Sequence, residues 1–228
     1  MQIAEIYGSV EGEGKYTGIP AMFVRVAGCN LACQYCDTAD IRNKEVGTAM
    51  SVRDIISFLK SFKYNTIVLT GGEPTLYYKE ITEMVEILSK DHTIILHTNG
   101  SVCNLDNIVN QCNVSLDVKL LNSGNLTTKN ESVINNLQLL TEKDEVKFVI
   151  TDLKDVITAI NFIETHGNFR PDYSFQIAWT DDRQQMRRNV QMLSWLLSRY
   201  TNTKYKMRIS VQQHKLLGID DIAIGGVF

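Results

Sequence analysis

Short apolar runs alternate with amphipathic segments along most of the chain. The runs are rich in β-branched residues and are nearly continuous, which is typical of strands buried on both faces. They predict strands at 21–26, 66–70, 93–97, 114–118, 146–150, 173–178 and 206–211. In the last run apolar and polar residues alternate, which favours an edge strand or an antiparallel strand.

The segments between the runs carry apolar residues at helical spacing, and we expect these stripes to face the core. One helix is expected to begin at Ser51, with Asp54 at the capping-box distance. Another is expected to follow a cap at Thr151, and a further one covers 184–200. The stripes are Ile81, Met84, Val85 and Leu88, then Leu153, Ile157 and Ile160, and then Met192, Leu193, Leu196 and Leu197.

This alternation of strands and helices predicts an α/β fold with a mainly parallel sheet. About six βα steps fit an incomplete parallel β/α barrel that occupies 1–228 as a single domain, and an open doubly wound sheet is the alternative. In both architectures binding sites form at the carboxyl ends of the strands.

Composition limits the possible partners. The chain has 228 residues, a net charge of −3 and a pI of about 5.8, which argues against a broad nucleic-acid surface. No apolar run approaches the roughly 18 residues that a membrane span needs, and the first residues do not resemble a signal peptide. We therefore expect a cytoplasmic protein that binds neither nucleic acid nor membrane.

Three of the five cysteines, Cys29, Cys33 and Cys36, lie within eight residues, directly after a predicted strand. Such a cluster in a cytosolic chain is more often a metal site than a disulfide framework. Three thiolates can hold three irons of a cubane cluster and leave the fourth iron open. We expect Cys103 and Cys112, which stand apart, to be buried core thiols.

Zinc is the alternative metal at the cysteine cluster. A structural zinc site needs four closed ligands, and no fourth cysteine or histidine lies nearby. The next candidates, His92, His97 and Cys103, are more than fifty residues downstream.

The spacing Cys-x3-Cys-x2-Cys, with Tyr35 just before the last cysteine, resembles the hallmark of radical S-adenosylmethionine enzymes. The resemblance implies a barrel of the radical S-adenosylmethionine type, with a [4Fe–4S] cluster in the loop 28–40. It also implies that S-adenosylmethionine chelates the open iron and is cleaved there to a radical, with Tyr35 against the cofactor.

A glycine turn, Thr70-Gly71-Gly72-Glu73-Pro74, ends one predicted strand. The glycines allow a close approach of the backbone, and Glu73 offers a carboxylate to an ammonium group. After a three-cysteine loop, the turn is similar to the family motif that binds the methionine amino group.

Polar residues also end the later strands. The Gln176 amide lies within an apolar run and needs a hydrogen-bond partner, either the cofactor or a neighbouring backbone group. A charged pair, Asp117 and Lys119, must face solvent or a ligand at the end of a buried strand. The cofactor-binding set implied by the resemblance is Tyr35, Cys36, Asp37, Gly72, Glu73, Asn99, Asp117, Lys119 and Gln176.

The flanking segments narrow the resemblance. They are Tyr7-Gly8-Ser9-Val10-Glu11-Gly12-Glu13-Gly14, Cys36-Asp37-Thr38 and Gln212-Gln213-His214-Lys215-Leu216-Leu217-Gly218. From about residue 3 to residue 219 the chain resembles the 7-carboxy-7-deazaguanine synthases, enzymes of 7-deazapurine nucleoside (queuosine-type) biosynthesis. The resemblance implies conversion of 6-carboxy-5,6,7,8-tetrahydropterin to 7-carboxy-7-deazaguanine with loss of ammonia.

The same resemblance implies site residues and partners. Arg25 is expected to pair with the substrate carboxylate, for which a guanidinium is suited; a surface acid or Asp37 is its alternative partner. Thr38 is expected to bind Mg²⁺. An electron donor such as flavodoxin or ferredoxin and a homodimer are also implied. The substrate-binding set is Val10, Glu11, Gly12, Glu13, Arg25, Thr70 and His214.

Two departures from the family pattern stand out. Glu11 replaces a glutamine, and an ionised carboxylate accepts hydrogen bonds but cannot donate them. The chain also continues through 220–228, a mostly apolar segment that we expect to close the pocket or to join a dimer contact. A radical-generating activase of another enzyme is the alternative function, because it uses the same cluster loop.

Overall fold

A curved sheet of nine strands, in the order β3-β1-β2-β4-β5-β6-β7-β8-β9, forms the frame of the protein. The computed structural model describes residues 1–200 and 204–219. All neighbours from β2 to β9 are parallel, whereas β1 is antiparallel to both β2 and β3. The sheet ends at β3 and β9 without closing, so the predicted incomplete barrel is confirmed.

All seven predicted strands are present, with bounds within two residues of the expected ones. They are β2 (Pro20–Val26), β4 (Thr66–Gly71), β5 (Thr93–Thr98), β6 (Asn113–Asp117), β7 (Glu145–Ile150), β8 (Asp172–Ile177) and β9 (Lys206–Ser210). The structure adds β1 (Gln2–Val10) and β3 (Thr48–Ala49). As an edge strand β9 fits the prediction, but it is parallel to β8 rather than antiparallel.

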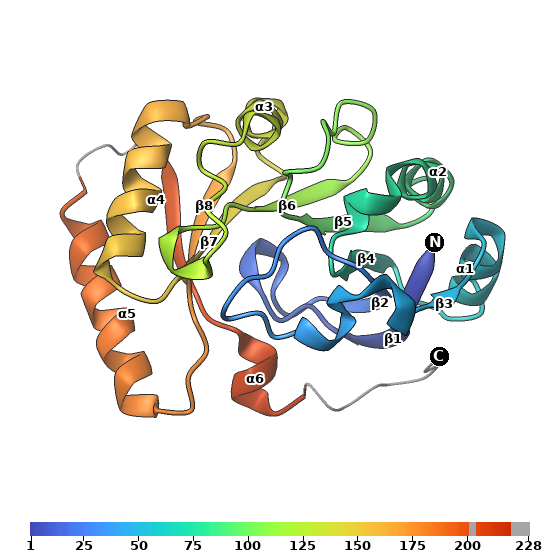
Figure 1. The fold of residues 1–228 in the computed structure, drawn as a ribbon, viewed down its shortest axis with the longest axis horizontal. Helices are drawn as coiled ribbons and strands as arrows, with labels where there is room; N and C mark the ends of the chain where they lie inside the picture. The colour runs from blue at the N-terminus through green and yellow to red at the C-terminus, as the bar shows by residue number, and fades with distance from the viewer. Residues whose placement is uncertain (201–203, 220–228) are drawn as a thin grey trace.

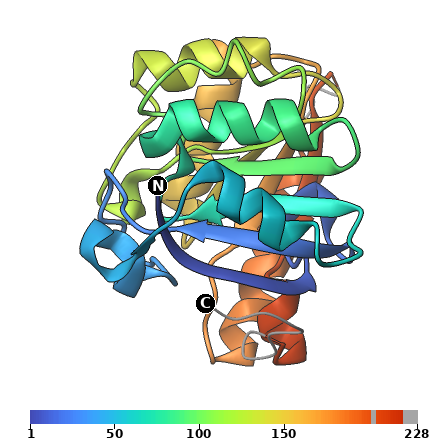
Figure 2. The same ribbon diagram turned by 90° about the vertical axis from the view of Figure 1, so that its right-hand side faces the viewer.

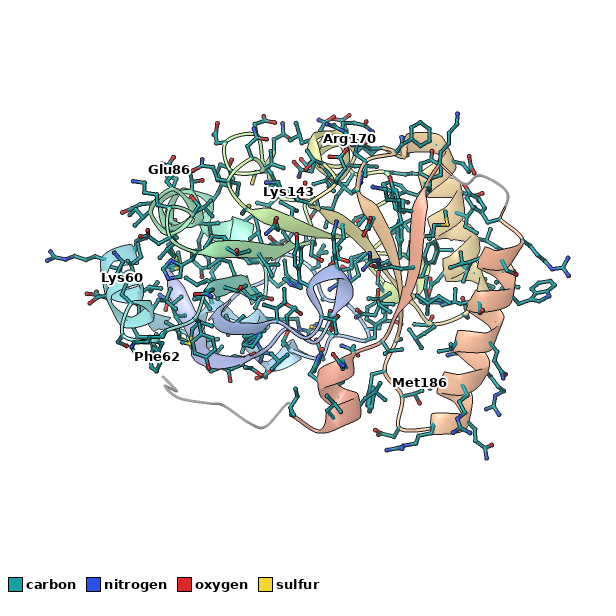
Figure 3. All side chains as sticks on the ribbon, turned by 180° about the vertical axis from the view of Figure 1, so that it is seen from behind. Lys60, Phe62, Glu86, Lys143, Arg170 and Met186 are labelled. Atoms are coloured by element: carbon teal, nitrogen blue, oxygen red, sulfur yellow. The ribbon has the colours of Figure 1, made fainter. Side chains whose placement is uncertain are left out.

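The helices lie around the outside of the sheet (Figures 1 and 2). The four predicted ones are α1 (Val52–Leu59), α2 (Tyr78–Leu88), α4 (Leu153–His166) and α5 (Arg183–Ser198); α3 (Glu131–Leu139) and α6 (Gln213–Leu217) are additional. Charged side chains such as Lys60 and Glu86 point away from the sheet (Figure 3). Among the described residues, none of the helices is both long and apolar enough to cross a lipid bilayer.

Two expectations for the helices need correction, and both concern α4. Its N-cap is Asp152, whose carboxylate accepts the N–H groups of Lys154 (2.8 Å) and Asp155 (3.1 Å), so the helix starts one residue later than a Thr151 cap implies. Leu153 and Ile157 were expected in the core, but they are 46% and 51% exposed.

A different face of α4 packs on the sheet. It presents Val156, Ala159, Phe162 and Ile163, and Phe162 meets Phe148 of β7 edge-on at 6.1 Å between ring centroids. Both candidate stripes satisfy helical spacing, and contact with the aromatic residues of β7 decides between them.

The two faces of the sheet carry different residues. On β7, Val146, Phe148 and Ile150 join the outer core beneath the helices, whereas Lys147 and Val149 line an inner cavity. Successive side chains of a strand point to opposite faces, so each strand contributes to both environments. The prediction that strands are buried on both faces is confirmed for β8, whose six residues are all buried, although the buried inner face also carries polar residues such as Lys147 and Gln176.

Candidate active site

A cavity of about 520 Å³ lies at the carboxyl ends of the parallel strands. Every residue that the sequence predicts for metal, cofactor or substrate lines this cavity. These residues are Val10, Glu11, Gly12, Glu13, Arg25, Cys29, Cys33, Tyr35, Cys36, Asp37, Thr38, Thr70, Gly72, Glu73, Asn99, Asp117, Lys119, Gln176 and His214. Their roles stay predictions, but the fold brings all of them to one place.

The three clustered cysteines sit on a loop that is fixed at both ends by backbone hydrogen bonds. The Cys29 N–H donates to Arg42 O (3.1 Å), and the Gln34 N–H donates to Ser123 O (2.9 Å). All three thiols are free and half-buried. Burial raises the pKa of Cys29 and of Cys33, so thiolates at these positions need a nearby positive charge, which a metal centre supplies.

The spacing of the three thiols does not match a tetrahedral zinc site. Thiolates around tetrahedral zinc are about 3.8 Å apart, which follows from Zn–S bonds of about 2.3 Å. Within residues 1–200 and 204–219, the three sulfur atoms do not gather within 4.8 Å of one another. His97, one candidate for a fourth zinc ligand, is bonded to Glu11 instead.

The other two cysteines differ from each other. Cys112 is buried in the core as predicted, and its thiol contacts Ile108 O at 3.3 Å. Cys103 is only half-buried, because it lies in the loop that follows β5 rather than in a strand or helix. The expectation of a buried core thiol is therefore wrong for Cys103.

The glycines of the Gly-Gly-Glu turn are required by packing within the protein. A Cβ on Gly72 would lie 2.1 Å from Gly28 O, and Gly71 has a φ of +119°. The Gly72 N–H donates to Val26 O (2.9 Å) and the Glu73 N–H to Gly28 O (2.8 Å). The glycines thus hold the turn directly against the start of the cysteine loop.

Glu73 is almost completely buried and ties the ends of β4 and β5 together. Its Oε1 accepts the hydroxyls of Thr75 (2.5 Å) and Thr98 (2.6 Å), and its Oε2 accepts the Asn99 N–H (2.7 Å). Burial raises the pKa of this carboxyl, although the hydrogen bonds from Thr75 and Thr98 act in the opposite direction. An ammonium group placed beside it would stabilise the charged form.

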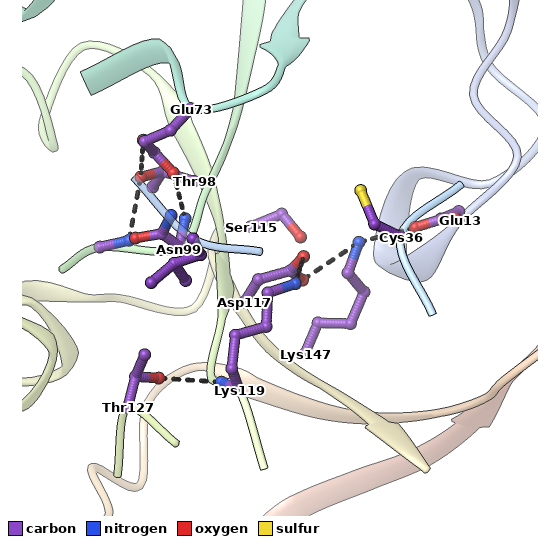
Figure 4. A network of polar contacts seen from close by, with 12 residues as sticks. Glu13, Cys36, Glu73, Thr98, Asn99, Ser115, Asp117, Lys119, Thr127 and Lys147 are labelled. Carbon is purple, nitrogen blue, oxygen red and sulfur yellow. Dashed lines mark hydrogen bonds and ion pairs between the residues drawn. The ribbon is translucent and has the colours of Figure 1, made fainter. Parts of the chain in front are cut away.

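A chain of alternating charges crosses the cavity from the N-terminal segment to β6 (Figure 4). Lys147 lies between two carboxylates, with its Nζ 2.6 Å from Glu13 Oε2 and 3.2 Å from Asp117 Oδ1. The other oxygen of Asp117 accepts a hydrogen bond from Lys119 Nζ at 2.8 Å. The two carboxylates and the two ammonium groups carry opposite charges, so the four groups together are neutral.

The pKa values show how strongly these buried groups depend on each other. Burial alone would lower the pKa of Lys147, but Asp117 and Glu13 raise it well above its ordinary value. Burial would raise the pKa of Glu13, but Lys147 and the Gln212 amide hold it far below the ordinary range. All of these groups are therefore charged at neutral pH.

Two polar atoms that line the cavity have no protein partner. Tyr35 OH and Gln176 Oε1 are buried and make no hydrogen bond within the described part of the chain. Buried polar groups are normally paired. Both residues belong to the predicted cofactor-binding set, and an unpaired acceptor and hydroxyl in a cavity indicate a polar ligand there.

Among the described residues, Arg25 pairs with Glu5 rather than with Asp37. Its Nη1 lies 3.0 Å from Glu5 Oε2, and its guanidinium is 5.0 Å from the centre of the Tyr7 ring. The pair is partly exposed, so it contributes little to stability and can rearrange. The alternative of a surface acid is therefore what the structure shows.

The segment 212–215 forms the wall of the cavity beside residues 12 and 13. The Gln213 N–H donates to Gly12 O (2.8 Å), and a Cβ on Gly12 would lie 2.1 Å from His214 Nδ1. Gln212 donates to Glu13 Oε1 at 2.7 Å. Parts of the chain that are distant in sequence thus meet over one small area.

Asp37, Glu13 and His214 also converge, with one side-chain atom of each within 4.8 Å of the others. Lys215 Nζ and Gln212 Nε2 each lie 3.2 Å from Asp37 Oδ2. Lys147 forms an ion pair with Glu13. These carboxylates are therefore already neutralised by the protein. Thr38, the predicted Mg²⁺ ligand, directly follows Asp37 in sequence, and its hydroxyl lies 3.7 Å from Cys36 Sγ.

Several residues that line the cavity were not predicted as part of the site, among them Tyr7, His97, Lys147, Gln212 and Lys215. Lys147 offered a signal, because a lysine within an otherwise apolar strand must find a charged partner. His97 offered a weaker one, at the inward position just before the end of β5.

The chain is similar to known proteins both in sequence and in fold. The profile of the Radical SAM superfamily matches residues 23–151. The chain is 33% identical over 220 residues to the 7-carboxy-7-deazaguanine synthase of Methanospirillum hungatei, covering 96% of this chain and 86% of that protein. It belongs to the 7-carboxy-7-deazaguanine synthase family. As a member of this radical S-adenosylmethionine family, it is an enzyme that uses a [4Fe–4S] cluster and S-adenosylmethionine.

A second member of the family and two solved structures are also similar to this chain. The family member from Clostridium acetobutylicum is 38% identical over 168 residues, which cover 71% of this chain and 74% of that protein. The crystal structure of QueE from Escherichia coli superposes with a TM-score of 0.70 at 18% identity, covering 92% of this chain and 93% of that one. SuiB of Streptococcus suis, with a TM-score of 0.59 at 15% identity, covers 91% of this chain and 55% of its own. At these identities the two structures establish the fold.

Proposed function

We propose that this protein converts 6-carboxy-5,6,7,8-tetrahydropterin to 7-carboxy-7-deazaguanine with loss of ammonia. The observation that carries the proposal is that one cavity joins the cysteine loop and Glu73 to the segments 10–13 and 212–215. The cysteine loop and Glu73 are shared by radical enzymes of many kinds. The two segments resemble the deazaguanine synthases, and the relatives named above carry that name.

Cys29, Cys33 and Cys36 hold the cluster in this proposal, and Glu73 accepts the methionine amino group. When bound at these residues, the cluster and S-adenosylmethionine would supply the radical chemistry that removal of the C6 hydrogen requires. Tyr35 and Gln176 supply the unpaired polar atoms that contact the cofactor. The remaining members of the cofactor set are Cys36, Asp37, Gly72, Asn99, Asp117 and Lys119.

Arg25 binds the substrate carboxylate, which replaces Glu5 as its partner. A guanidinium forms two parallel hydrogen bonds with a carboxylate, so the exchange fixes both the position and the orientation of the substrate. That orientation places one C–H bond toward the radical, and positioning of this kind is the main protein contribution to cofactor chemistry. The remaining substrate contacts are Val10, Glu11, Gly12, Glu13, Thr70 and His214.

Further parts of the proposal concern the surroundings of the site. Thr38 binds Mg²⁺ together with the substrate, since a hydroxyl is a suitable hard ligand. A flavodoxin or ferredoxin supplies the electron at the half-buried cysteine loop. The protein is a single radical domain, acts in the cytoplasm and forms a homodimer, for which the exposed Leu216 and Leu217 of α6 offer apolar surface. The expected contribution of 220–228 lies outside the described residues.

Anaerobic turnover tests the reaction. The reconstituted and reduced protein is expected to form 7-carboxy-7-deazaguanine, and Mg²⁺ is expected to raise the rate, a response that Thr38→Ala blunts. Arg25→Ala should raise KM and lower kcat/KM, whereas Arg53→Ala, on the exposed face of α1, should change neither. Cleavage of S-adenosylmethionine without product from the pterin would contradict the proposal and favour the activase.

A further inference from the structure

Glu11 and His97 meet inside the cavity, one after the end of β1 and the other near the end of β5. Glu11 Oε2 lies 3.1 Å from His97 Nε2, and the second oxygen accepts the Glu13 N–H at 3.0 Å. Only 4% of the Glu11 side chain and 15% of the His97 side chain are exposed. The contact is thus a buried pair between the residue that follows β1 and a residue of β5, and these two strands are not neighbours in the sheet.

A buried carboxylate needs a compensating charge. The other titratable groups that face this pair are Glu13 and Lys147, and Lys147 is already bonded to Glu13 and Asp117. The protonated ring of His97 therefore supplies the positive charge that compensates the Glu11 carboxylate. Burial would lower the pKa of His97, but Glu11 raises it above its ordinary value of 6.5. Burial would raise the pKa of Glu11, but His97 brings it below its ordinary value.

The pair leaves acceptor positions free on Glu11. A carboxylate offers about four lone-pair positions, and the structure shows two of them occupied, by His97 and by the Glu13 N–H. Glu11 lines the cavity, so the others are available to a ligand. A carboxylate with two free positions matches a ring edge that carries two adjacent N–H donors, such as the amino group and ring N–H of a pterin.

We propose that His97 is a positioning residue that holds Glu11 as an anion, and that this pair selects substrates with two adjacent N–H donors on one ring edge. The selection part rests on the proposed function, because it takes the tetrahydropterin as the ligand. The pairing part does not, because it concerns only the protein's own groups.

Histidine titration by NMR tests the pairing without cofactor or substrate. The chain has four histidines, so their ¹⁵N signals can be assigned with single variants. His97 is expected to stay protonated above pH 6.5, and its pKa should fall in Glu11→Gln, where burial and Lys147 act without the compensating carboxylate. His92→Gln, on a half-buried histidine after α2, is the control and should leave the His97 titration unchanged. An unshifted His97 titration in Glu11→Gln overturns the pairing.

Steady-state kinetics test the selection. His97→Gln is expected to raise the KM for the tetrahydropterin by about tenfold or more, the value of one hydrogen bond to a charged group, and to leave the uncoupled cleavage of S-adenosylmethionine unchanged. The variant Glu11→Gln/His97→Gln should be no worse than Glu11→Gln alone, because His97 acts through Glu11. A lower melting temperature of His97→Gln with an unchanged KM shows a merely structural role and overturns the proposal.

A pterin analogue without the amino group separates positioning from general binding. The wild type should discriminate against it, and His97→Gln should lose most of that discrimination. Equal discrimination by both proteins overturns the selection. If the wild type forms no product from the tetrahydropterin, the proposed function fails, and the NMR titration still decides whether the pair exists.

The pH dependence of KM gives a further readout. The pair is complete below the raised pKa of His97 and is lost as the pH rises through that value, so KM should rise there. The inflection should disappear in Glu11→Gln/His97→Gln. A wild-type KM that is flat through this range contradicts the proposal.

Discussion

Glu73 accepts hydrogen bonds from Thr75, Thr98 and Asn99 and is also the residue that is proposed to hold the methionine amino group. The protein itself supplies the donors from Thr75, Thr98 and Asn99, so the carboxylate is already oriented before the cofactor binds. Burial raises the pKa of this carboxyl, so an ammonium group bound beside it would stabilise its charged form.

Glu73→Gln is therefore expected to weaken S-adenosylmethionine binding by roughly 1.5–3 kcal/mol, the range for a hydrogen bond to a charged group. Titration calorimetry on the reconstituted protein measures this. Thr75→Val is the matched control, because it removes one donor to Glu73 and keeps the carboxylate, so its affinity should be close to that of the wild type. Similar losses in both variants would assign Glu73 to the turn alone.

The cysteines allow a second test at this scale. Cys29→Ala, Cys33→Ala and Cys36→Ala should each abolish the cluster, because an open cubane site requires all three thiolates. Cys103→Ala and Cys112→Ala should keep it, since neither thiol lines the cavity. Iron content after anaerobic reconstitution is the measurement, and full iron in any of the first three variants contradicts the assignment.

For single residues, the sequence predicted which ones lie at the site but not which residues they contact. The positions of Arg25 and Glu11 at the site were predictable, but their partners Glu5 and His97 were not. Such contacts depend on which strands lie next to each other across the cavity. No spacing along the chain contains that information.

At the scale of elements, helix starts depend on one or two hydrogen bonds. Ser51 caps α1 as predicted, with its hydroxyl accepting the Asp54 N–H at 3.2 Å. In α4 the cap is Asp152, which accepts two N–H groups, whereas the hydroxyl of the preceding Thr151 donates to Asp155 Oδ2 at 2.7 Å.

Asp152→Ala should lower the free energy of unfolding by about 1 kcal/mol through loss of this cap. Lys154→Ala, on the exposed surface of the same first turn, should change it by less than about 0.5 kcal/mol. Urea denaturation of the cluster-free protein compares the two. Equal effects would mean that another residue caps α4.

Elements were predicted where a periodic apolar pattern dominates, and they were missed where tertiary contacts override local preference. In α3 the segment contains two asparagines, which are poor helix formers. Asn136 is nonetheless fully buried, and its amide bonds Gly100 O (3.0 Å), Cys103 O (2.9 Å) and the Leu105 N–H (2.9 Å). These hydrogen bonds to the loop after β5 stabilise the helix in the folded protein.

Across the whole molecule, Lys147 joins parts that are far apart in the chain. It connects Glu13, which follows β1, with Asp117 at the end of β6, and Gln212 adds a bond to Glu13 from beyond β9. The barrel class was predictable from the alternation of strands and helices. This internal connection was not, because it depends on which residues of each strand face inward.

Lys147→Met should reduce stability by about 3–5 kcal/mol, since it leaves the buried Glu13 carboxylate without its cation and removes one of the two cations that contact Asp117. Adding Glu13→Gln should recover part of that loss by removing the uncompensated charge. Lys63→Met, at an exposed position, is the control and should change stability little. Thermal unfolding measures all three, and a Lys147→Met protein as stable as the control would show that the buried charges are compensated elsewhere.

The wall formed by Gly12, Glu13 and Gln212 also has a consequence for biosynthesis. The residues of the Gln212–Glu13 bond are separated by 199 positions, so the first side of this wall leaves the ribosome long before the second. Domains fold as their segments emerge, from the N-terminus onward. The cysteine loop, the Glu73 turn and β5 can assemble while the cavity is still open on that side. A growing chain can therefore take up its iron before it can enclose a substrate, and the enclosing wall is the last part of the site to be built.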